Sequence, residues 1–375
     1  QTNNARTSTF QLKSGVSLYG GFLGNETNRD QRNWTNNPTI LSGDLDQSGI
    51  IHSEDDDWEH YHAYYSDAYH VVTGANNAVL DGFTITRGRA LNDPYSVPLT
   101  SGGGMYNNNS SPTVTNCIFL KNTATHGAGM YNDNSSSPTV TDCTFSRNGA
   151  DVGGGMTNMF SSSSTVTNCI FDSNDAYSGA GGMSNWDASP TVINCTFTNN
   201  KGSAAGGMYN AWGSNPMIKD CTFSNNLAEF FGAGHPEYPS RGGYGGGMHN
   251  WWASPTIEHC TFSNNVARRS GGGMNNWGAS PTVINCTFSN NAATNSIEGI
   301  AASGGGMANG RDDGSHGPAP HISSSPTVTG CIFTGNSAKD FGGGMYSNDD
   351  SPDDPTWTKM STVTDCTFTS NSAQS

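Results

Sequence analysis

The sequence predicts an all-β fold: a single-stranded right-handed parallel β-solenoid with about 26 residues and three short strands in each of roughly 11 to 12 coils. Three observations predict it. A cysteine recurs at a spacing of 26 residues, a phenylalanine stands two residues after each cysteine, and an asparagine stands five residues after it. A repeat of this length buries its apolar side chains only by stacking on its neighbours. Composition alone gives no fold, because only 33% of the residues are hydrophobic and 48 are glycine.

The cysteines mark one corner of each coil. Val or Ile stands three residues before each cysteine, so Val or Ile, Cys and Phe should form three inward ladders. The residue just before each cysteine is Asn, Asp, His or Gly, and these residues tolerate a positive φ, which predicts a sharp bend between two strands. Free cysteine is commonly buried, so we expect a reduced ladder, although stacked coils would also allow disulfides. The nine cysteines are Cys117, Cys143, Cys169, Cys195, Cys221, Cys260, Cys286, Cys331 and Cys366.

The asparagine that follows each cysteine predicts a second ladder. Coils stack ~4.8 Å apart, so identical side-chain amides can hydrogen-bond along the stack and satisfy backbone groups at a turn. A third segment carries Gly-Met, followed two residues later by another asparagine in all but one coil. The first series comprises Asn122, Asn148, Asn174, Asn200, Asn226, Asn265, Asn291, Asn336 and Asn371.

The chain divides into an irregular and a regular part. Residues 1–100 are predicted to be the entry region of the solenoid, with a loop rich in acidic residues and histidine, and residues 101–375 a regular nine-coil solenoid. Leu80 to Gly88 already follow the coil spacing, with Phe83 in the cysteine position. Inserted loops are expected near 227–245, 292–303, 310–325 and 347–361.

Charge and hydropathy exclude two classes of partner. The formal net charge is -15, which opposes binding to nucleic acid or to an anionic membrane surface. No apolar run approaches the ~20 residues of a membrane-spanning helix, so no membrane insertion is expected. The kind of repeat and the abundance of Thr, Ser and Asn predict a secreted, extracellular or cell-surface location. Because Gln1 opens the sequence, we interpret it as a processed chain.

The repeat motifs carry a family resemblance. Phe-x-x-Asn, as in Phe119 to Asn122, followed by Gly-Gly-x-Met or Gly-Gly-Met, resembles the repeats of chlamydial polymorphic outer-membrane adhesins. It is also similar to the wider class of bacterial parallel β-helix (PbH1-type) repeat surface proteins, although Met stands where the adhesin motif has an aliphatic residue. The resemblance covers nearly the whole chain. It implies the architecture, while the same fold class includes adhesins, filaments, lyases and glycoside hydrolases.

Five tryptophans are the candidate binding residues. They stand three or four residues after the Met of four consecutive coils, so they should line one edge of the rod. Exposed aromatic strips bind sugars or protein surfaces, and the alternative is that inserted loops cover them. The residues are Trp186, Trp212, Trp251, Trp252 and Trp277.

No metal or cofactor is predicted. Acidic loops can bind Ca²⁺, but none here has an EF-hand pattern, so solvated loops are the expectation. Three histidines beside the first acidic cluster have no ligand spacing. The acidic clusters lie at 54–57, 312–313 and 349–354, and the histidines are His60, His62 and His70.

No catalytic constellation stands out either. Glycoside hydrolysis needs two carboxylates flanking the scissile bond, and lyases need a base with a cation or Arg. An active site would be sought in the loop after Cys221 and one coil later. The residues there are Glu229, His235, Glu237, Arg241, Arg268 and Arg269.

The expected function is therefore a non-enzymatic extracellular structural or adhesive rod. A solenoid needs polar caps at its ends, and the chain stops at Ser375 just after a Cys-Phe-Asn strand, so copies are expected to stack head to tail into filaments. The rival explanation is that the chain is a truncated part of a longer surface protein, which would show the same open ends. The alternatives are a polysaccharide lyase or glycoside hydrolase, and a carbohydrate-binding adhesion module, each using the tryptophans. The expected partners are a second copy, or an extracellular glycan or host surface.

Overall fold

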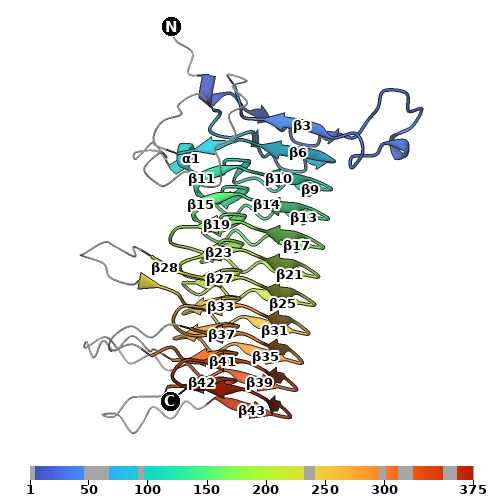
Figure 1. Cartoon of the computed structure of the whole chain (residues 1–375). Coiled ribbons are helices and arrows are strands. Elements are labelled where there is room, and N and C mark those ends of the chain that lie inside the picture. The colour runs from blue at the N-terminus through green and yellow to red at the C-terminus, as the bar shows by residue number, and fades with distance from the viewer. Residues whose placement is uncertain are drawn as a thin grey trace.

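The computed structural model describes residues 5–45, 67–91, 97–231, 241–294, 301–310, 324–348 and 361–374. The chain forms a rod of stacked coils, with the two termini at opposite ends (Figure 1). Three of the four large sheets contain eleven strands, one from each coil, and neighbouring strands in all four are parallel. The parallel solenoid and its number of coils are as predicted.

Each coil has four short strands rather than the three predicted. The additional strand follows the asparagine of the first ladder, as in Thr123–His126 (β11). Strands at this position are only 2–4 residues long, too short for an alternating pattern to be recognised. We call the four sheets A to D, in the order in which the chain passes through them from the Gly-Met strand.

Sheet A contains the Gly-Met strands. The methionines from Met105 to Met307 point inward and are fully buried. Two residues later the second asparagine series also points inward, and each side-chain Nδ2 donates to Oδ1 of the next asparagine at 2.8–2.9 Å. The strands are β1 (Phe10–Gln11), β4 (Val72–Thr73), β8 (Met105–Asn108), β12 (Met130–Asp133), β16 (Met156–Met159), β20 (Met183–Trp186), β24 (Met208–Ala211), β30 (Met248–Trp251), β34 (Met274–Trp277), β38 (Met307–Asn309) and β42 (Met345–Ser347).

Sheet B carries the inward Val or Ile ladder and ends at a bend. The residue before the cysteine has a φ between 52° and 65° in all nine coils, as the sequence predicts. The strands are β2 (Ser17–Tyr19), β5 (Val79–Asp81), β9 (Thr113–Thr115), β13 (Thr139–Thr141), β17 (Thr165–Thr167), β21 (Thr191–Ile193), β25 (Met217–Lys219), β31 (Thr256–Glu258), β35 (Thr282–Ile284), β39 (Thr327–Thr329) and β43 (Thr362–Thr364).

Sheet C carries the phenylalanine ladder. Consecutive rings stack almost parallel from Phe119 to Phe368, with centroids 4.6–4.8 Å apart. This column forms the centre of the apolar core with the Met, Val and Cys ladders. The strands are β3 (Thr39–Ser42), β6 (Phe83–Thr86), β10 (Ile118–Leu120), β14 (Thr144–Ser146), β18 (Ile170–Asp172), β22 (Thr196–Thr198), β26 (Thr222–Ser224), β32 (Thr261–Ser263), β36 (Thr287–Ser289), β40 (Ile332–Thr334) and β44 (Thr367–Thr369).

The first asparagine series stands between sheets C and D and forms the predicted ladder. Each Nδ2 from Asn122 to Asn336 donates to Oδ1 of the next asparagine at 2.9–3.1 Å and to a backbone carbonyl of the preceding coil. The strands of sheet D are β7 (Arg89–Ala90), β11 (Thr123–His126), β15 (Gly149–Val152), β19 (Asp175–Ala176), β23 (Lys201–Gly202), β27 (Leu227–Ala228), β33 (Val266–Ala267), β37 (Ala292–Ala293), β41 (Ser337–Ala338) and β45 (Ser372–Ala373).

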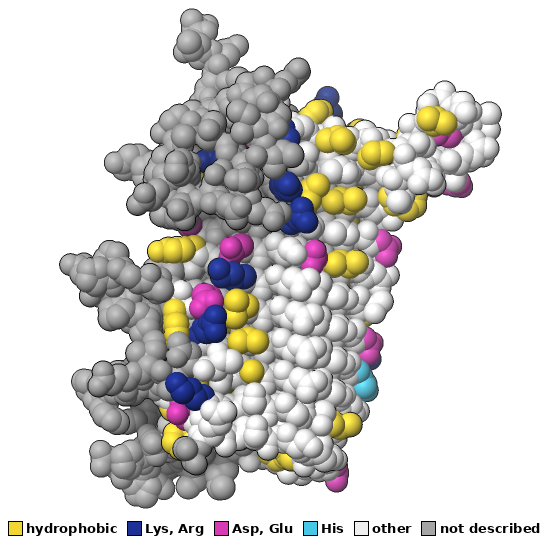
Figure 2. Space-filling model, in the orientation of Figure 1, with side chains coloured by type: hydrophobic (Ala, Val, Ile, Leu, Met, Phe, Trp, Pro, Cys, Tyr) yellow, Lys and Arg dark blue, Asp and Glu magenta, His cyan; other side chains and the backbone are white. Residues whose placement is uncertain are grey.

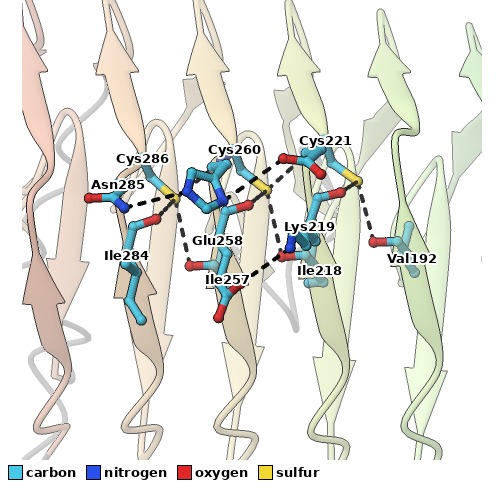
Figure 3. Close-up of polar contacts among 12 residues, drawn as sticks. Val192, Ile218, Lys219, Cys221, Ile257, Glu258, Cys260, Ile284, Asn285 and Cys286 are labelled. Atoms are coloured by element: carbon cyan, nitrogen blue, oxygen red, sulfur yellow. Dashed lines mark hydrogen bonds and ion pairs between the residues drawn. The ribbon is translucent and has the colours of Figure 1, made fainter.

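The cysteines line the bend between sheets B and C as free thiols, and all but Cys366 are buried. Figure 3 shows how three consecutive rungs are bonded. Sγ of Cys260 lies 3.2 Å from the carbonyl oxygen of Glu258 and 3.7 Å from that of Ile218 one coil earlier. The same sulfur accepts the backbone N–H of Cys221 at 3.4 Å. The thiols therefore satisfy backbone groups at the bend, in addition to filling space as small apolar side chains.

Substitutions at Cys260 test this hydrogen-bonding role. Cys260→Ala removes the acceptor of the buried Cys221 N–H, so we expect it to lower the free energy of unfolding by about 1–3 kcal/mol. Cys260→Ser keeps a hydroxyl that can accept this N–H and donate to a carbonyl, so it should be tolerated better than alanine. Urea denaturation of both variants shows which substitution lowers the free energy of unfolding more. If the thiol were only apolar filler, serine would be the more damaging replacement.

Few elements lie outside the coils. Two 3-10 turns, η1 (Ala5–Thr7) and η2 (Arg29–Gln31), and one α-helical turn, α1 (Val97–Thr100), belong to the N-terminal region. The segment between β2 and β3 extends sideways from the rod (Figure 1). None of the described helices is long and apolar enough to cross a membrane.

One ion pair fixes this lateral segment to the next coil. Arg32 is paired with Asp81 of β5, and both side chains are largely buried. The Arg32 guanidinium also lies over the rings of Tyr19 and Trp34, 5.2 and 4.8 Å from their centroids. The base of the segment is therefore held against β2 and β5.

Candidate functional site

The five tryptophans lie on the outer side of the rod, where sheet A ends and the chain turns toward sheet B. Trp186, Trp251 and Trp277 are the last residues of β20, β30 and β34. Trp212 and Trp252 occupy the next position, where the backbone turns with φ of 55° and 53°. The parallel register of sheet A places this position of one coil beside the same position of the next. We call the five residues the tryptophan strip.

Four of the five rings of the strip, those of Trp212, Trp251, Trp252 and Trp277, contact one another. The Trp212 ring meets those of Trp251 and Trp252 edge to face, with centroids 4.9 and 5.2 Å apart, and the Trp251 and Trp277 centroids are 6.3 Å apart. Trp212 and Trp252 are 47% and 39% exposed, while the other three are half-buried. Exposed Phe160, whose N–H donates to the Trp186 carbonyl, extends the strip by one coil.

A second aromatic row, made of Tyr209, His249 and Tyr244, lies beside the strip; the first two stand directly after Met208 and Met248. Tyr209 and His249 stack at 5.4 Å, His249 and Tyr244 at 5.5 Å, and Trp186 meets Tyr209 edge to face at 5.4 Å. Tyr209 and His249 are buried although they alternate with the inward Met and Asn. They are the second residues of β24 and β30 and stand on the outer face of sheet A, the same face as Trp251. Sequence reasoning missed this row because its residue types vary from coil to coil.

A comparison with protein families assigns the chain. The family model described as "right handed beta helix region" matches residues 59–188 and 237–375, well over half of the sequence. The chain belongs to this right-handed β-helix family. Membership gives the hand of the coil that the sequence predicted. No curated protein matches the chain. Because one β-helix fold supports several functions, the function of this β-helix has to be argued from its surface.

The residues singled out for catalysis partly come together. Glu229 and Arg268, on neighbouring coils of the β-helix, form a two-point ion pair with N–O distances of 2.9 and 3.3 Å. Burial raises the pKa of Glu229, but the hydrogen bond and charge of Arg268 outweigh it, and the net pKa is lowered. A carboxylate held ionised in this way is poorly suited to act as a general acid.

Arg269 lies between this ion pair and the buried aromatic row. Its guanidinium hydrogen-bonds the Tyr244 hydroxyl and lies over the rings of Tyr244 and Phe230, 5.2 and 5.8 Å from their centroids. The antiparallel pair β28 (Phe230–Phe231) and β29 (Arg241–Gly242) begins and ends the inserted loop here. The structure thus places Arg269 in an aromatic packing role. His235, Glu237 and the Arg241 side chain lie outside the described residues.

The metal-binding hypotheses concern other segments of the β-helix. The acidic clusters at 54–57, 312–313 and 349–354 lie outside the described residues, as do His60 and His62. His70 is described, and its ring stacks on Tyr106 with centroids 4.9 Å apart. Among the residues that the structure describes, no three His, Cys, Asp or Glu side chains are grouped to hold a metal ion.

The buried His249 predicts a pH dependence of stability. Burial lowers the pKa of His249 to about 4, from 6.5 for an unperturbed histidine. Its Nδ1 lies 2.9 Å from Nδ2 of Asn275, an amide donor, and 3.4 Å from the backbone carbonyl oxygen of Asn275, an acceptor. Between pH 6.5 and 4 the unfolded chain binds a proton that the folded chain does not, so stability falls as the pH falls.

The expected loss across this window is about 3 kcal/mol. His249→Asn, which copies the residue that the next coil carries at this position, should flatten the dependence. The measurement is urea denaturation of both proteins at pH 7 and pH 4.5, and the difference between them isolates His249 from other titrating groups. If both proteins lost the same free energy of unfolding between pH 7 and pH 4.5, His249 would not be the responsible group.

Proposed function

We propose that this β-helix is a non-enzymatic adhesive rod outside the cell that binds a glycan through the tryptophan strip. The exposure of Trp212 and Trp252 in neighbouring coils supports the proposal most strongly. Large aromatic side chains left in contact with water, ring against ring, mark interaction surfaces. Indole combines an apolar face with an N–H donor, which suits the C–H faces and hydroxyls of sugars.

The charges beside the strip favour binding without cleavage. Glycoside hydrolysis needs one carboxyl group with a raised pKa and a second carboxylate across the bond. Glu229 is instead paired with Arg268 and has a lowered pKa. The enzymatic alternative therefore draws no support from this ion pair.

The experiment combines binding with product analysis. The purified chain is incubated with a panel of neutral and acidic polysaccharides, the bound fraction is measured by co-sedimentation, and the supernatant is analysed by mass spectrometry. We expect saturable binding and no shortening of the polymer. If the chain released oligosaccharides and the Glu229→Gln variant did not, the protein would be a lyase or hydrolase and the proposal would be wrong.

A cell-surface location and a closer relationship to the polymorphic adhesins belong to the same proposal. Figure 2 shows the face formed by sheets C and D, where uncharged polar side chains cover most of the centre and acidic and basic side chains alternate to one side. Such a face suits a protein surrounded by water. Antibody labelling of intact source cells, compared with permeabilised cells, would test the location.

Head-to-tail association is a second proposal. Leu18 continues the ladder of Val363, so a second copy stacked in register would extend the same ladders. Electron microscopy over a concentration series should show filaments that lengthen with concentration. Single rods at every concentration would contradict it.

A further inference from the structure

A row of polar side chains runs beside the tryptophan strip, two or three residues further along the chain. Each member accepts a backbone N–H from the following coil, with N–O distances of 2.6–3.1 Å. The row is thus held in one geometry, with one member in each coil. We call these residues the serine row: Ser111, Ser137, Ser163, Ser189, Asn215, Ser254 and Ser280.

The hydroxyls of this row retain hydrogen-bonding capacity. A serine hydroxyl has one proton and two lone pairs. Ser189 accepts the Asn215 N–H at 2.9 Å and Ser254 accepts the Ser280 N–H at 2.9 Å, which occupies one lone pair of each. Both side chains are exposed. Each can therefore donate its proton to a ligand without losing its bond to the backbone.

The strip and the row repeat with the same period. Both advance by one coil, ~4.8 Å along the rod. The strip and Phe160 together occupy five consecutive coils, and serine or asparagine accompanies them in each. A surface that offers an aromatic side chain and a serine or asparagine at every step fits a polymer that presents a C–H face and hydroxyl groups with a similar step. An extended β-linked polysaccharide has this property.

We propose that the ligand is an uncharged, extended β-linked polysaccharide that lies along the long axis of the rod, with one sugar residue at each coil. This inference rests on the proposed function and specifies its ligand. The aromatic strip stacks on the sugar rings, and the serine row donates to their hydroxyls. An uncharged polymer fits because the net charge of -15 opposes a polyanion, and Arg268, a candidate partner for an acidic sugar, is already paired with Glu229.

The length of the bound oligosaccharide tests the orientation. Cello-oligosaccharides and N-acetylchito-oligosaccharides of two to eight residues are titrated into the full chain by calorimetry. Affinity should rise with each added residue up to about five, the number of coils covered by the strip together with Phe160, and then level off. A plateau at two or three residues would mean that the glycan crosses the rod, which would overturn the inference and leave glycan binding standing.

Serine variants test the row. Ser189→Ala and Ser254→Ala should each weaken binding of the longest oligosaccharide by roughly 3- to 10-fold. Ser189→Thr, which keeps the hydroxyl, should restore binding. The matched control is Ser137→Ala, which removes an equivalent exposed hydroxyl beside Asn134 instead of an aromatic ring.

The outcomes separate the two proposals. Unchanged affinity in both alanine variants, with unchanged melting temperatures, would overturn the role of the row. If Ser189→Ala and Ser254→Ala weakened binding only as much as Ser137→Ala does, the role of the row would also be overturned, because the loss would then not depend on a neighbouring aromatic ring. Absence of binding by every oligosaccharide and by the polysaccharide panel would instead remove the proposed function itself.

Discussion

Replacing Asn200 with leucine is expected to lower the free energy of unfolding by about 3 kcal/mol or more. Asn200 Nδ2 donates to the Phe171 carbonyl at 2.8 Å, and its Oδ1 accepts the backbone N–H of Asn174 at 3.0 Å. Leucine has a similar volume and cannot make either bond. Both backbone groups would then be buried without these partners, and each such group costs about 1–3 kcal/mol.

The control is Lys201→Leu, which places the same side chain at the adjacent exposed position. It should change stability by about 0.5 kcal/mol or less, as is usual for surface substitutions. Urea denaturation followed by circular dichroism measures both variants. If Asn200→Leu were as stable as Lys201→Leu, the side-chain amides of the ladder would not stabilise the coil, and the phenylalanine stack alone would account for it.

The double substitution Trp212→Ala with Trp252→Ala is expected to weaken glycan binding at least 30-fold, on the order of 2 kcal/mol or more. The two rings are the most exposed of the strip and lie in contact at 5.2 Å. Truncating both removes the aromatic surface at its centre while leaving the half-buried Trp251 and Trp277. Because these side chains point outward, stability should change little.

Trp34→Ala provides the matched control. Trp34 is 38% exposed, comparable to Trp252, but lies on the lateral segment near the first coil. Calorimetry with the same polysaccharide should show unchanged affinity in this variant. Equal losses in the control and the double variant would point to nonspecific aromatic adsorption, and no loss in either would assign the binding to another face.

The regular features of the fold were predictable because every coil repeats them. The cysteine spacing and the asparagine ladder each rest on one residue type at one position, and the bend before each cysteine on a small set of residues that tolerate a positive φ, so a single sequence contains nine observations of each rule. A stacked parallel solenoid follows from this repetition, since only stacking buries such short strands.

Other features carry no such signal. A second positive φ, of 54–63°, occurs four residues after each cysteine, yet Lys121, Arg147 and Ser173 show how varied the residues there are. The fourth strand is as short as two residues. The pairing of Glu229 with Arg268 joins residues 39 apart across an insertion. These features depend on contacts between coils. The sequence repeat predicts such contacts only between positions that recur in every coil.

The candidate site was likewise predictable only in part. The tryptophans could be placed on one edge from their offset to the methionine. Their unequal exposure could not be predicted from the sequence. It depends on whether the ring stands at the last residue of a strand, as in β20, β30 and β34, or at the turn that follows the strand. The serine row escaped notice because serine is common throughout the chain.

Tryptophan-selective oxidation in the presence and absence of bound polysaccharide, mapped by mass spectrometry, tests the central claim most directly. The account predicts that the glycan protects Trp212 and Trp252 from oxidation, while Trp34, similarly exposed but outside the strip, is oxidised equally in both conditions. Equal oxidation of Trp212 and Trp252 with and without saturating glycan would contradict it, because the bound polymer would then lie elsewhere on the rod.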